Sequence, residues 1–178
     1  MKRLCEEYAA ALYELAEENS LEDIISNQLT QIACLLAYNP DYIKLLDNPA
    51  VEKQTRVKLA EESFSGAEQY LKNFIMLLVE ARRVNELEEC AKVFSRIYDE
   101  KHNIVRAEAV TAAPLDKAQS ARIKEKLEVG TGKTVILTNT IDPSIIGGVL
   151  LKYGTEQIDM SVRTSLNSIS DLISNADI

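Results

Sequence analysis

The sequence predicts an α+β protein, in which an amino-terminal six-helix bundle is followed by a small β-α-β-β-β-α module. This prediction depends on a change of period along the chain. Up to His102, apolar residues recur every three or four positions, as they do on one face of a helix. From Asn103 onward, apolar and polar residues alternate, which is typical of a half-exposed strand. We therefore expect two domains, 1–102 and 103–178, joined without a Gly/Ser-rich linker.

The first predicted helix ends at about Glu18. Its apolar side is formed by residues three and four positions apart, namely Leu4, Tyr8, Ala11, Leu12 and Leu15. The alanine side chains of this helix are small, so a second helix can pack closely against it. The spacing alone leaves two alternatives open, an alanine-rich core helix and a helix that binds a partner.

The next three helices are predicted from their boundary residues. Ser20 is expected to cap the second helix, which ends before Asn39-Pro40. A short helix covers 41–46. Asn48 is expected to cap the fourth helix, with Pro49 as its first residue.

The last two helices of the bundle cover 67–81 and 84–102. The first of them is strongly apolar, and its wide apolar face includes Phe74 and Leu78. A helix with such a face is expected to lie near the centre of a bundle.

The module begins with a strand after Asn103. Pro114 is expected to open a helix over 115–129, which Gly130 ends. The β-branched run 133–138 then predicts a second strand.

The stretch from Ile141 onward predicts a hairpin followed by a helix. Asp142-Pro143 favours a turn, and a short apolar strand follows it. Gly147-Gly148 within this strand indicates a bulge or another backbone lying close. A turn at Tyr153-Gly154 and a return strand over 156–159 complete the hairpin. Ser161 is expected to cap the last helix.

These residues resemble the carboxy-terminal signature of the delta subunit of bacterial F-type ATP synthases. The mitochondrial counterpart of that family is the oligomycin-sensitivity-conferring protein. The match consists of the Asp142-Pro143 turn, Ile146-Gly147-Gly148-Val149, the Gly154 turn, and Ile158-Asp159-Met160-Ser161-Val162-Arg163 with Leu166. Met160 stands where glycine is common. The run Tyr8-Ala9-Ala10-Ala11-Leu12 resembles the amino-terminal signature of the same family. The resemblance therefore covers nearly the whole chain.

The resemblance implies a non-catalytic stator subunit without a cofactor. Such a subunit links the catalytic head to the b-subunit stalk and resists rotor torque during ion-gradient-driven ATP synthesis. Its expected location is the cytoplasmic face of a bacterial membrane, to which it is attached through the complex.

Two partner surfaces follow from the same resemblance. The bundle is expected to hold the amino-terminal helix of an alpha subunit in a groove. The candidates for this groove are Tyr8, Ala11, Leu12, Leu15, Phe74 and Leu78. The module is expected to bind the carboxy-terminal coiled coil of the b subunits. Its candidates are Ile146, Val149, Leu151 and Val162. A role in the core is an equal alternative for each residue taken singly.

The net charge of −8 is concentrated in the helical half of the chain. Residues 1–102 carry 12 Lys and Arg against 19 Asp and Glu, which gives −7, and the remainder has 8 against 9, which gives −1. This distribution argues against nucleic-acid binding, because a polyanion requires clustered cations. Acidic helices also argue against direct binding to a lipid surface, and the apolar runs are too short to span a bilayer.

Three features that suggest chemistry have simpler structural explanations. Gly130-Thr131-Gly132-Lys133-Thr134 lacks the spacing of a phosphate loop and lies between a helix and a strand, so we expect no nucleotide site. His102 is the only histidine and is expected at a helix end. Asp159, Ser161 and Arg163 are explained by helix capping and an ion pair.

The three cysteines, Cys5, Cys34 and Cys90, show no metal-binding spacing and are expected to be buried, reduced thiols.

The alternatives to a stator subunit are an unrelated helix-binding adaptor of another assembly and a small nucleotide-binding enzyme.

Overall fold

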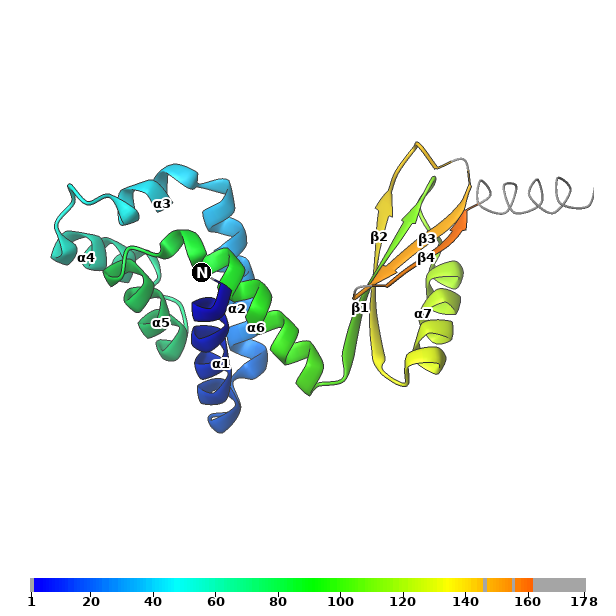
Figure 1. Ribbon diagram of the computed structural model, residues 1–178, viewed down its shortest axis with the longest axis horizontal. Helices are drawn as coiled ribbons and strands as arrows, with labels where there is room; N and C mark the ends of the chain where they lie inside the picture. Colours follow the sequence, from blue (N-terminus) through cyan, green and yellow to red (C-terminus); the bar gives the residue numbers. More distant parts are fainter. Residues whose placement is uncertain (1, 146, 155, 162–178) are drawn as a thin grey trace, which may run out of the picture. The chain divides into compact units, whose positions relative to one another are not determined.

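The computed structural model describes residues 2–145, 147–154 and 156–161. The chain divides into two compact units, Met1–Tyr98 and Asp99–Ile178 (Figure 1). The first unit contains helices and the second contains a four-stranded sheet with a helix, so the predicted α+β class is confirmed. No helix among the described residues is both long enough and apolar enough to cross a bilayer.

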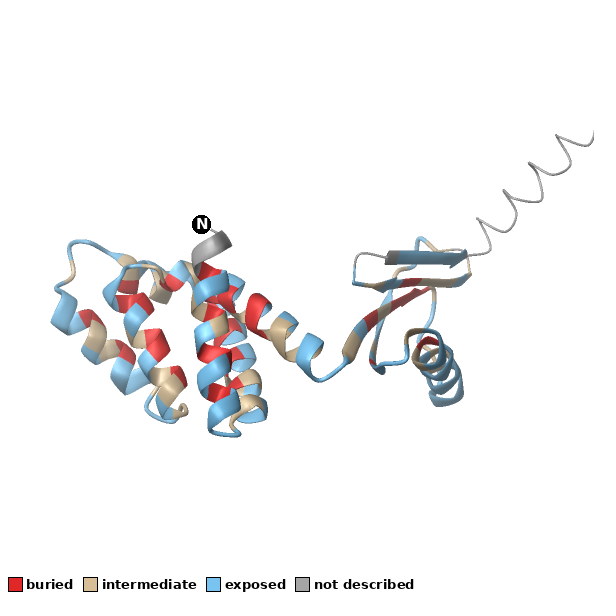
Figure 2. Cartoon of the chain, turned by 60° about the horizontal axis from the view of Figure 1, so that its bottom comes forward, coloured by how far each residue is buried: buried red, intermediate tan, exposed pale blue. Residues whose placement is uncertain are grey.

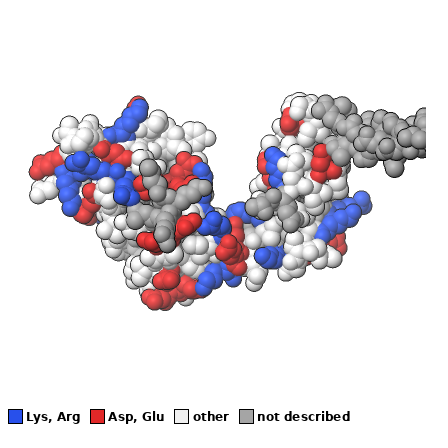
Figure 3. All heavy atoms as spheres, in the orientation of Figure 1, with Lys and Arg blue, Asp and Glu red and all other residues white. Residues whose placement is uncertain are grey.

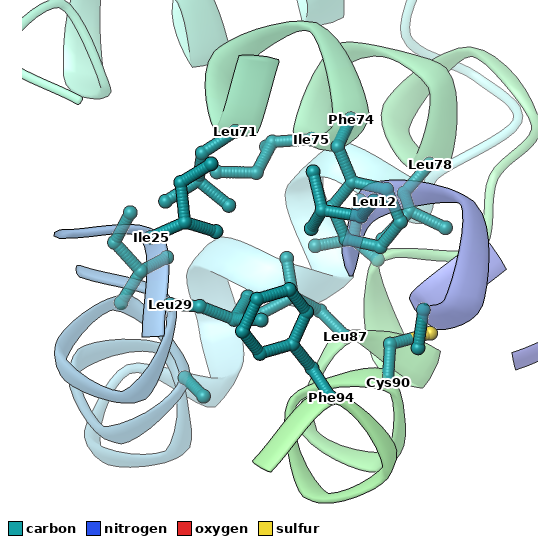
Figure 4. Close-up of a cluster of buried hydrophobic side chains, with 14 of the residues drawn as sticks. Leu12, Ile25, Leu29, Leu71, Phe74, Ile75, Leu78, Leu87, Cys90 and Phe94 are labelled. Atoms are coloured by element: carbon teal, nitrogen blue, oxygen red, sulfur yellow. The ribbon is translucent and has the colours of Figure 1, made fainter. Parts of the chain in front are cut away.

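The helical unit contains six α-helices and one short 3-10 helix among the described residues. In chain order they are α1 (Lys2–Glu18), α2 (Glu22–Tyr38), α3 (Pro40–Asp47), α4 (Lys53–Ser63), α5 (Gln69–Glu80), η1 (Val84–Glu86) and α6 (Leu87–Lys101). Each of the six α-helices contributes buried side chains to one hydrophobic cluster. Figure 4 shows the centre of this cluster, where Leu12 of α1 lies beside Phe74 and Leu78 of α5.

Two helices begin later than the sequence predicts. Ser20 has a positive φ of 54° and lies in the turn between α1 and α2, so it does not cap α2. Asn48 accepts a hydrogen bond from the backbone amide of Ala50 (2.8 Å), and α4 begins only at Lys53. In both places the residue type identifies a turn correctly, and at Asn48 the side chain stabilises the loop instead of the helix end.

Arg56 is a charged residue in the core of the helical unit. Its side chain is 2% exposed, and Nη1 donates hydrogen bonds to the carbonyl oxygens of Leu46 (2.9 Å) and Val79 (3.0 Å). These carbonyls belong to the last turns of α3 and α5, where the helix dipole is negative. Arg56 therefore joins three helices from within α4.

The module contains β1 (Ile104–Thr111), α7 (Lys117–Thr131), β2 (Thr134–Ile141), β3 (Gly148–Tyr153) and β4 (Glu156–Ser161). The strand order is β2-β1-β3-β4. β1 pairs in parallel with β2, to which it is connected through α7, and antiparallel with β3. The predicted helix after Ser161 lies outside the described residues.

Helix α7 is shifted by two residues from its predicted range of 115–129. A capping box starts it, in which the Asp116 carboxylate accepts from the Gln119 amide (2.6 Å) and the Gln119 side chain accepts from the Asp116 amide (3.0 Å). Gly130 lies within the helix, and Gly132, at φ 67°, is the residue that ends it. Only glycine adopts this left-handed conformation without strain, which explains why the second glycine is the cap.

The hairpin differs from the prediction at both of its ends. β3 begins at Gly148, which has a φ of 87°, so Gly147 precedes the strand instead of lying within it. β4 continues through Ser161, so this residue is the last in a strand and not a helix cap in the described region. The predicted turn at Asp142 is present, and its carboxylate accepts from the Ser144 amide (2.9 Å).

Candidate functional site

Helices α1 and α5 pack side by side in the helical unit. The Tyr70 hydroxyl near the start of α5 is 3.3 Å from the side-chain oxygen of Asn19, which follows α1. Tyr8, Leu15 and Asn19 share one side of α1, and Tyr70 and Leu77 share one side of α5. The bond therefore brings these two sides together at one end. Beneath them, Leu12, Phe74 and Leu78 are buried in the common core (Figure 4).

Several apolar side chains at this junction remain accessible to solvent. Leu15 is 42% exposed and Leu77 is 59% exposed, while Ala11 is exposed and Tyr8 is half-buried. We call this set, Tyr8, Ala11, Leu15 and Leu77, the α1–α5 surface. It is an apolar strip above buried side chains, and its chemistry suits the apolar face of another helix.

The candidate residues of the bundle therefore fall into two groups. Ala11, Leu15 and Tyr8 lie on the α1–α5 surface, whereas Leu12, Phe74 and Leu78 form its floor and are 6% exposed or less. Sequence reasoning missed Leu77 as a surface residue, because the apolar face of α5 is too wide to show which side is left uncovered.

The candidate residues of the module are less accessible. Leu151 is 3% exposed and packs with Leu127 of α7, and Val149 is half-buried at the edge of the same cluster. Ile146 and Val162 lie outside the described residues.

The glycine-rich turn has the geometry of a helix carboxyl end. Gly132 caps α7 by donating its amide to the Glu128 carbonyl (2.8 Å), and β2 begins at Thr134. The helix end presents carbonyl groups at this turn, whereas a phosphate needs the free amides of a helix amino end. His102 directly follows α6, at the predicted helix end.

Two of the three thiols are buried and one is accessible. Cys5 and Cys90 are 2% and 1% exposed, and burial raises the pKa of both thiols. A neutral, buried thiol is a weak nucleophile. Cys34 is exposed on α2, which corrects the expectation that all three thiols are buried.

Charged side chains of both signs are mixed over the helical unit. Figure 3 shows Asp and Glu interspersed with Lys and Arg on the visible face of this unit. No cluster of three or more His, Cys, Asp or Glu that could hold a metal occurs in the part of the chain that the structure describes. The helical unit also exposes apolar side chains such as Leu15 and Leu77, and exposed apolar patches often contact other proteins of an assembly.

Comparisons with known proteins identify the assembly. The family model of the ATP synthase delta (OSCP) subunit matches residues 4–173. ATP synthase subunit delta of Lactobacillus gasseri is 36% identical over 98% of this chain and 97% of its own length. The subunit delta of Clostridioides difficile is 31% identical over 94% of this chain and 93% of its own.

A solved structure has the same fold. A chain in the cryo-EM structure of the Toxoplasma gondii mitochondrial ATP synthase hexamer superimposes with a TM-score of 0.73. It is 21% identical in sequence, and the match covers 96% of this chain and 97% of that chain.

The protein is thus of the class of ATP synthase subunits. It belongs to the ATP synthase delta (OSCP) subunit family, whose members are structural components of the peripheral stalk.

Proposed function

We propose that this protein is the stator connector between the catalytic head and the b-subunit stalk of a bacterial F-type ATP synthase. The helical domain, 1–102, holds the head, and the module, 103–178, holds the stalk. The protein catalyses no reaction and needs no cofactor. It reaches the cytoplasmic face of the membrane through the complex, without inserting into the bilayer itself.

The α1–α5 surface carries the proposal for the head. Leu15 and Leu77 expose apolar area above a floor of buried side chains, so a docking helix meets a preformed site. A preformed site lowers the conformational entropy that is lost on binding. The partner that fits is the amphipathic amino-terminal helix of an alpha subunit, and no nucleotide or nucleic acid is involved.

The mechanical role follows from holding two partners at once. A rotary motor does work only when its stator does not turn with its rotor, so the connector must transmit the counter-torque. Once one partner is bound, binding of the other becomes intramolecular, and the two contacts reinforce each other. The module is proposed to grip the carboxy-terminal coiled coil of the b subunits through Val149 and the adjoining Ile146 and Val162. Buried Leu151 supports this contact from the core of the module instead of touching the partner.

The first test measures binding of a peptide with the alpha-subunit amino-terminal sequence by titration calorimetry. Leu15→Asp and Leu77→Asp should each weaken binding about 10- to 100-fold, because a charge replaces a central apolar contact. The matched control is Leu35→Asp on α2, at a side chain that is 61% exposed. This control should keep the wild-type affinity. Equal losses in all three variants would reject the α1–α5 surface as the site.

The second test separates the two grips. A chain ending at His102 should bind the alpha-subunit peptide with the affinity of the full chain and should lose binding to the b-subunit coiled coil. A folded truncated chain that binds neither partner would count against the assignment of one partner to each domain.

A further inference from the structure

Two buried cysteines meet in the core of the helical unit. Cys5 is the fourth residue of α1, and Cys90 is the fourth residue of α6, 85 positions later in the sequence. Figure 2 shows the buried residues of this unit in red, and both cysteines belong to this core, with exposed fractions of 2% and 1%. Their side chains form a hydrogen bond with each other, and Figure 4 shows the Cys90 sulfur pointing toward α1. The fold therefore brings two thiols from distant parts of the chain into contact.

The surroundings keep both thiols neutral in the reduced chain. Burial raises the pKa of the Cys5 thiol and of the Cys90 thiol, and the nearby carboxylates of Glu86 and Glu89 raise both pKa values further. The Cys5 sulfur also donates to Oε2 of Glu86 (3.5 Å). A neutral thiol inside a core reacts only when a local opening exposes it. The two thiols therefore stay reduced until an oxidant reaches them.

The folded state nevertheless favours a covalent bond between the two sulfurs. A disulfide from Cys5 to Cys90 closes a loop that contains most of the helical unit. Closing a long loop removes conformational entropy from the unfolded chain, so it stabilises the folded chain relative to the unfolded one. Folding and oxidation form a closed thermodynamic cycle, so folding promotes the disulfide by the same factor by which the disulfide promotes folding. For a disulfide of typical strength this factor is about 100.

We propose that Cys5 and Cys90 are a redox-sensitive pair, which a disulfide oxidant such as oxidised glutathione converts into a covalent tie between α1 and α6. One cysteine thiolate attacks the oxidant, releases one molecule of reduced glutathione and forms a mixed disulfide. The other cysteine thiolate then attacks the protein sulfur of this mixed disulfide and releases the second molecule. The protein thus loses two electrons and two protons, which the two molecules of reduced glutathione carry away.

The tie strengthens the helical unit without changing its surface. Both sulfurs lie inside the core, whereas Tyr8, Ala11 and Leu15 of the same helix α1 remain on the α1–α5 surface. Under oxidising conditions the helix that carries this surface is therefore held to α6 by a covalent bond. This inference does not depend on the stator role.

Refolding in redox buffers tests the proposal. The full chain carrying Cys34→Ser is refolded from urea into buffers with graded ratios of oxidised to reduced glutathione, so that burial does not limit the rate. Peptide mass spectrometry measures the fraction of chains with a bond between Cys5 and Cys90, and the same chain kept in urea is the reference. Folding should raise the equilibrium constant for this bond about 100-fold. The oxidised chain should also unfold at a urea concentration about 1–3 M higher than the reduced chain.

The matched control is the full chain carrying Cys5→Ala. It also keeps two thiols, exposed Cys34 and buried Cys90. Folding should not promote a disulfide between these two. A further measurement compares hydrogen exchange in the oxidised and the reduced Cys34→Ser chain. The tie should slow exchange of the α1 amides about tenfold and leave the α7 amides, in the other unit, unchanged.

Three outcomes would overturn the proposal. The first is an equal equilibrium constant for the bond in the folded and the unfolded chain. The second is a disulfide in the Cys5→Ala chain that folding promotes as strongly, which would show oxidation without a specific pair. The third is an oxidised chain with the urea midpoint and the α1 exchange rates of the reduced chain, because the bond would then tie nothing together.

Discussion

Replacing Arg56 by methionine should destabilise the helical unit by about 3 kcal/mol. Methionine keeps most of the side-chain volume but cannot donate to the Leu46 and Val79 carbonyls. Hydrogen bonds from a charged group contribute about 1.5–3 kcal/mol each, which gives about 3–6 kcal/mol for the two. The Val79 carbonyl also accepts from the Arg82 amide (3.2 Å), so its loss is partial.

A second effect opposes the first. Burial of a guanidinium costs several kcal/mol, and Arg56 forms no ion pair within the part of the chain that the structure describes. Its Nε is also buried without a hydrogen bond among these residues. Substitution removes this desolvation cost, which brings the expected net loss to the lower end of the range. The loss of the Leu46 contact and the weakening of the Val79 contact nevertheless outweigh the relief.

Urea unfolding followed by tyrosine fluorescence measures the effect. The protein has no tryptophan, and Tyr153 is the only one of its seven tyrosines outside the helical unit. With a urea dependence of about 1–3 kcal/mol per M, the midpoint should fall by about 1–3 M. The control is Lys58→Met, an exposed residue of the same helix. If Arg56→Met lowers the midpoint no more than Lys58→Met does, the buried cation does not stabilise the fold.

Three other predictions concern thiols and a helix cap. Burial raises the pKa of the Cys90 thiol above its ordinary value of 9.0. The contribution of this thiol to the free energy of unfolding is therefore fully present below pH 9.0 and decreases as the pH rises above it. Relative to Cys90→Ala, the wild type should lose up to about 1.4 kcal/mol per pH unit there, and parallel pH profiles in urea unfolding would contradict this. In the native chain Cys34 alone should react rapidly with a thiol reagent, since Cys5 and Cys90 are buried, and three fast-reacting thiols would be inconsistent with the fold. Asp116→Ala should destabilise α7 by about 1 kcal/mol, measured by hydrogen exchange of its amides, and Glu125→Ala on the exposed side of α7 should have little effect, so equal changes would exclude a capping role.

The α+β class could be predicted because it depends on hydrophobic period, which is distributed over many residues. The change at Asn103 falls between α6 and β1, as expected. Helix starts were predicted less well, because one polar group can bond within a loop or to a helix end with similar energy. Asn48 is an example, and only the backbone path between elements decides which bond forms.

The candidate site was predicted only in part for a related reason. Apolar spacing places Leu12, Leu15, Phe74 and Leu77 on helices, but it does not show which of them a neighbouring helix covers. That depends on the packing of α1 against α5. Arg56 could not be recognised at all, because a lone arginine in a polar helix gives no sign that two other helices end at its position.

The position of β1 within the sheet has a mechanical consequence. The chain enters the module through β1, which lies between β2 and β3 and forms eight residue pairs with one and five with the other. A force pulling on Ile104 along the strand therefore stretches two ladders of hydrogen bonds in shear at the same time. An edge strand under the same tension would peel away one bond after another. The sheet therefore resists sustained tension best when the force acts along β1 at this point of the chain.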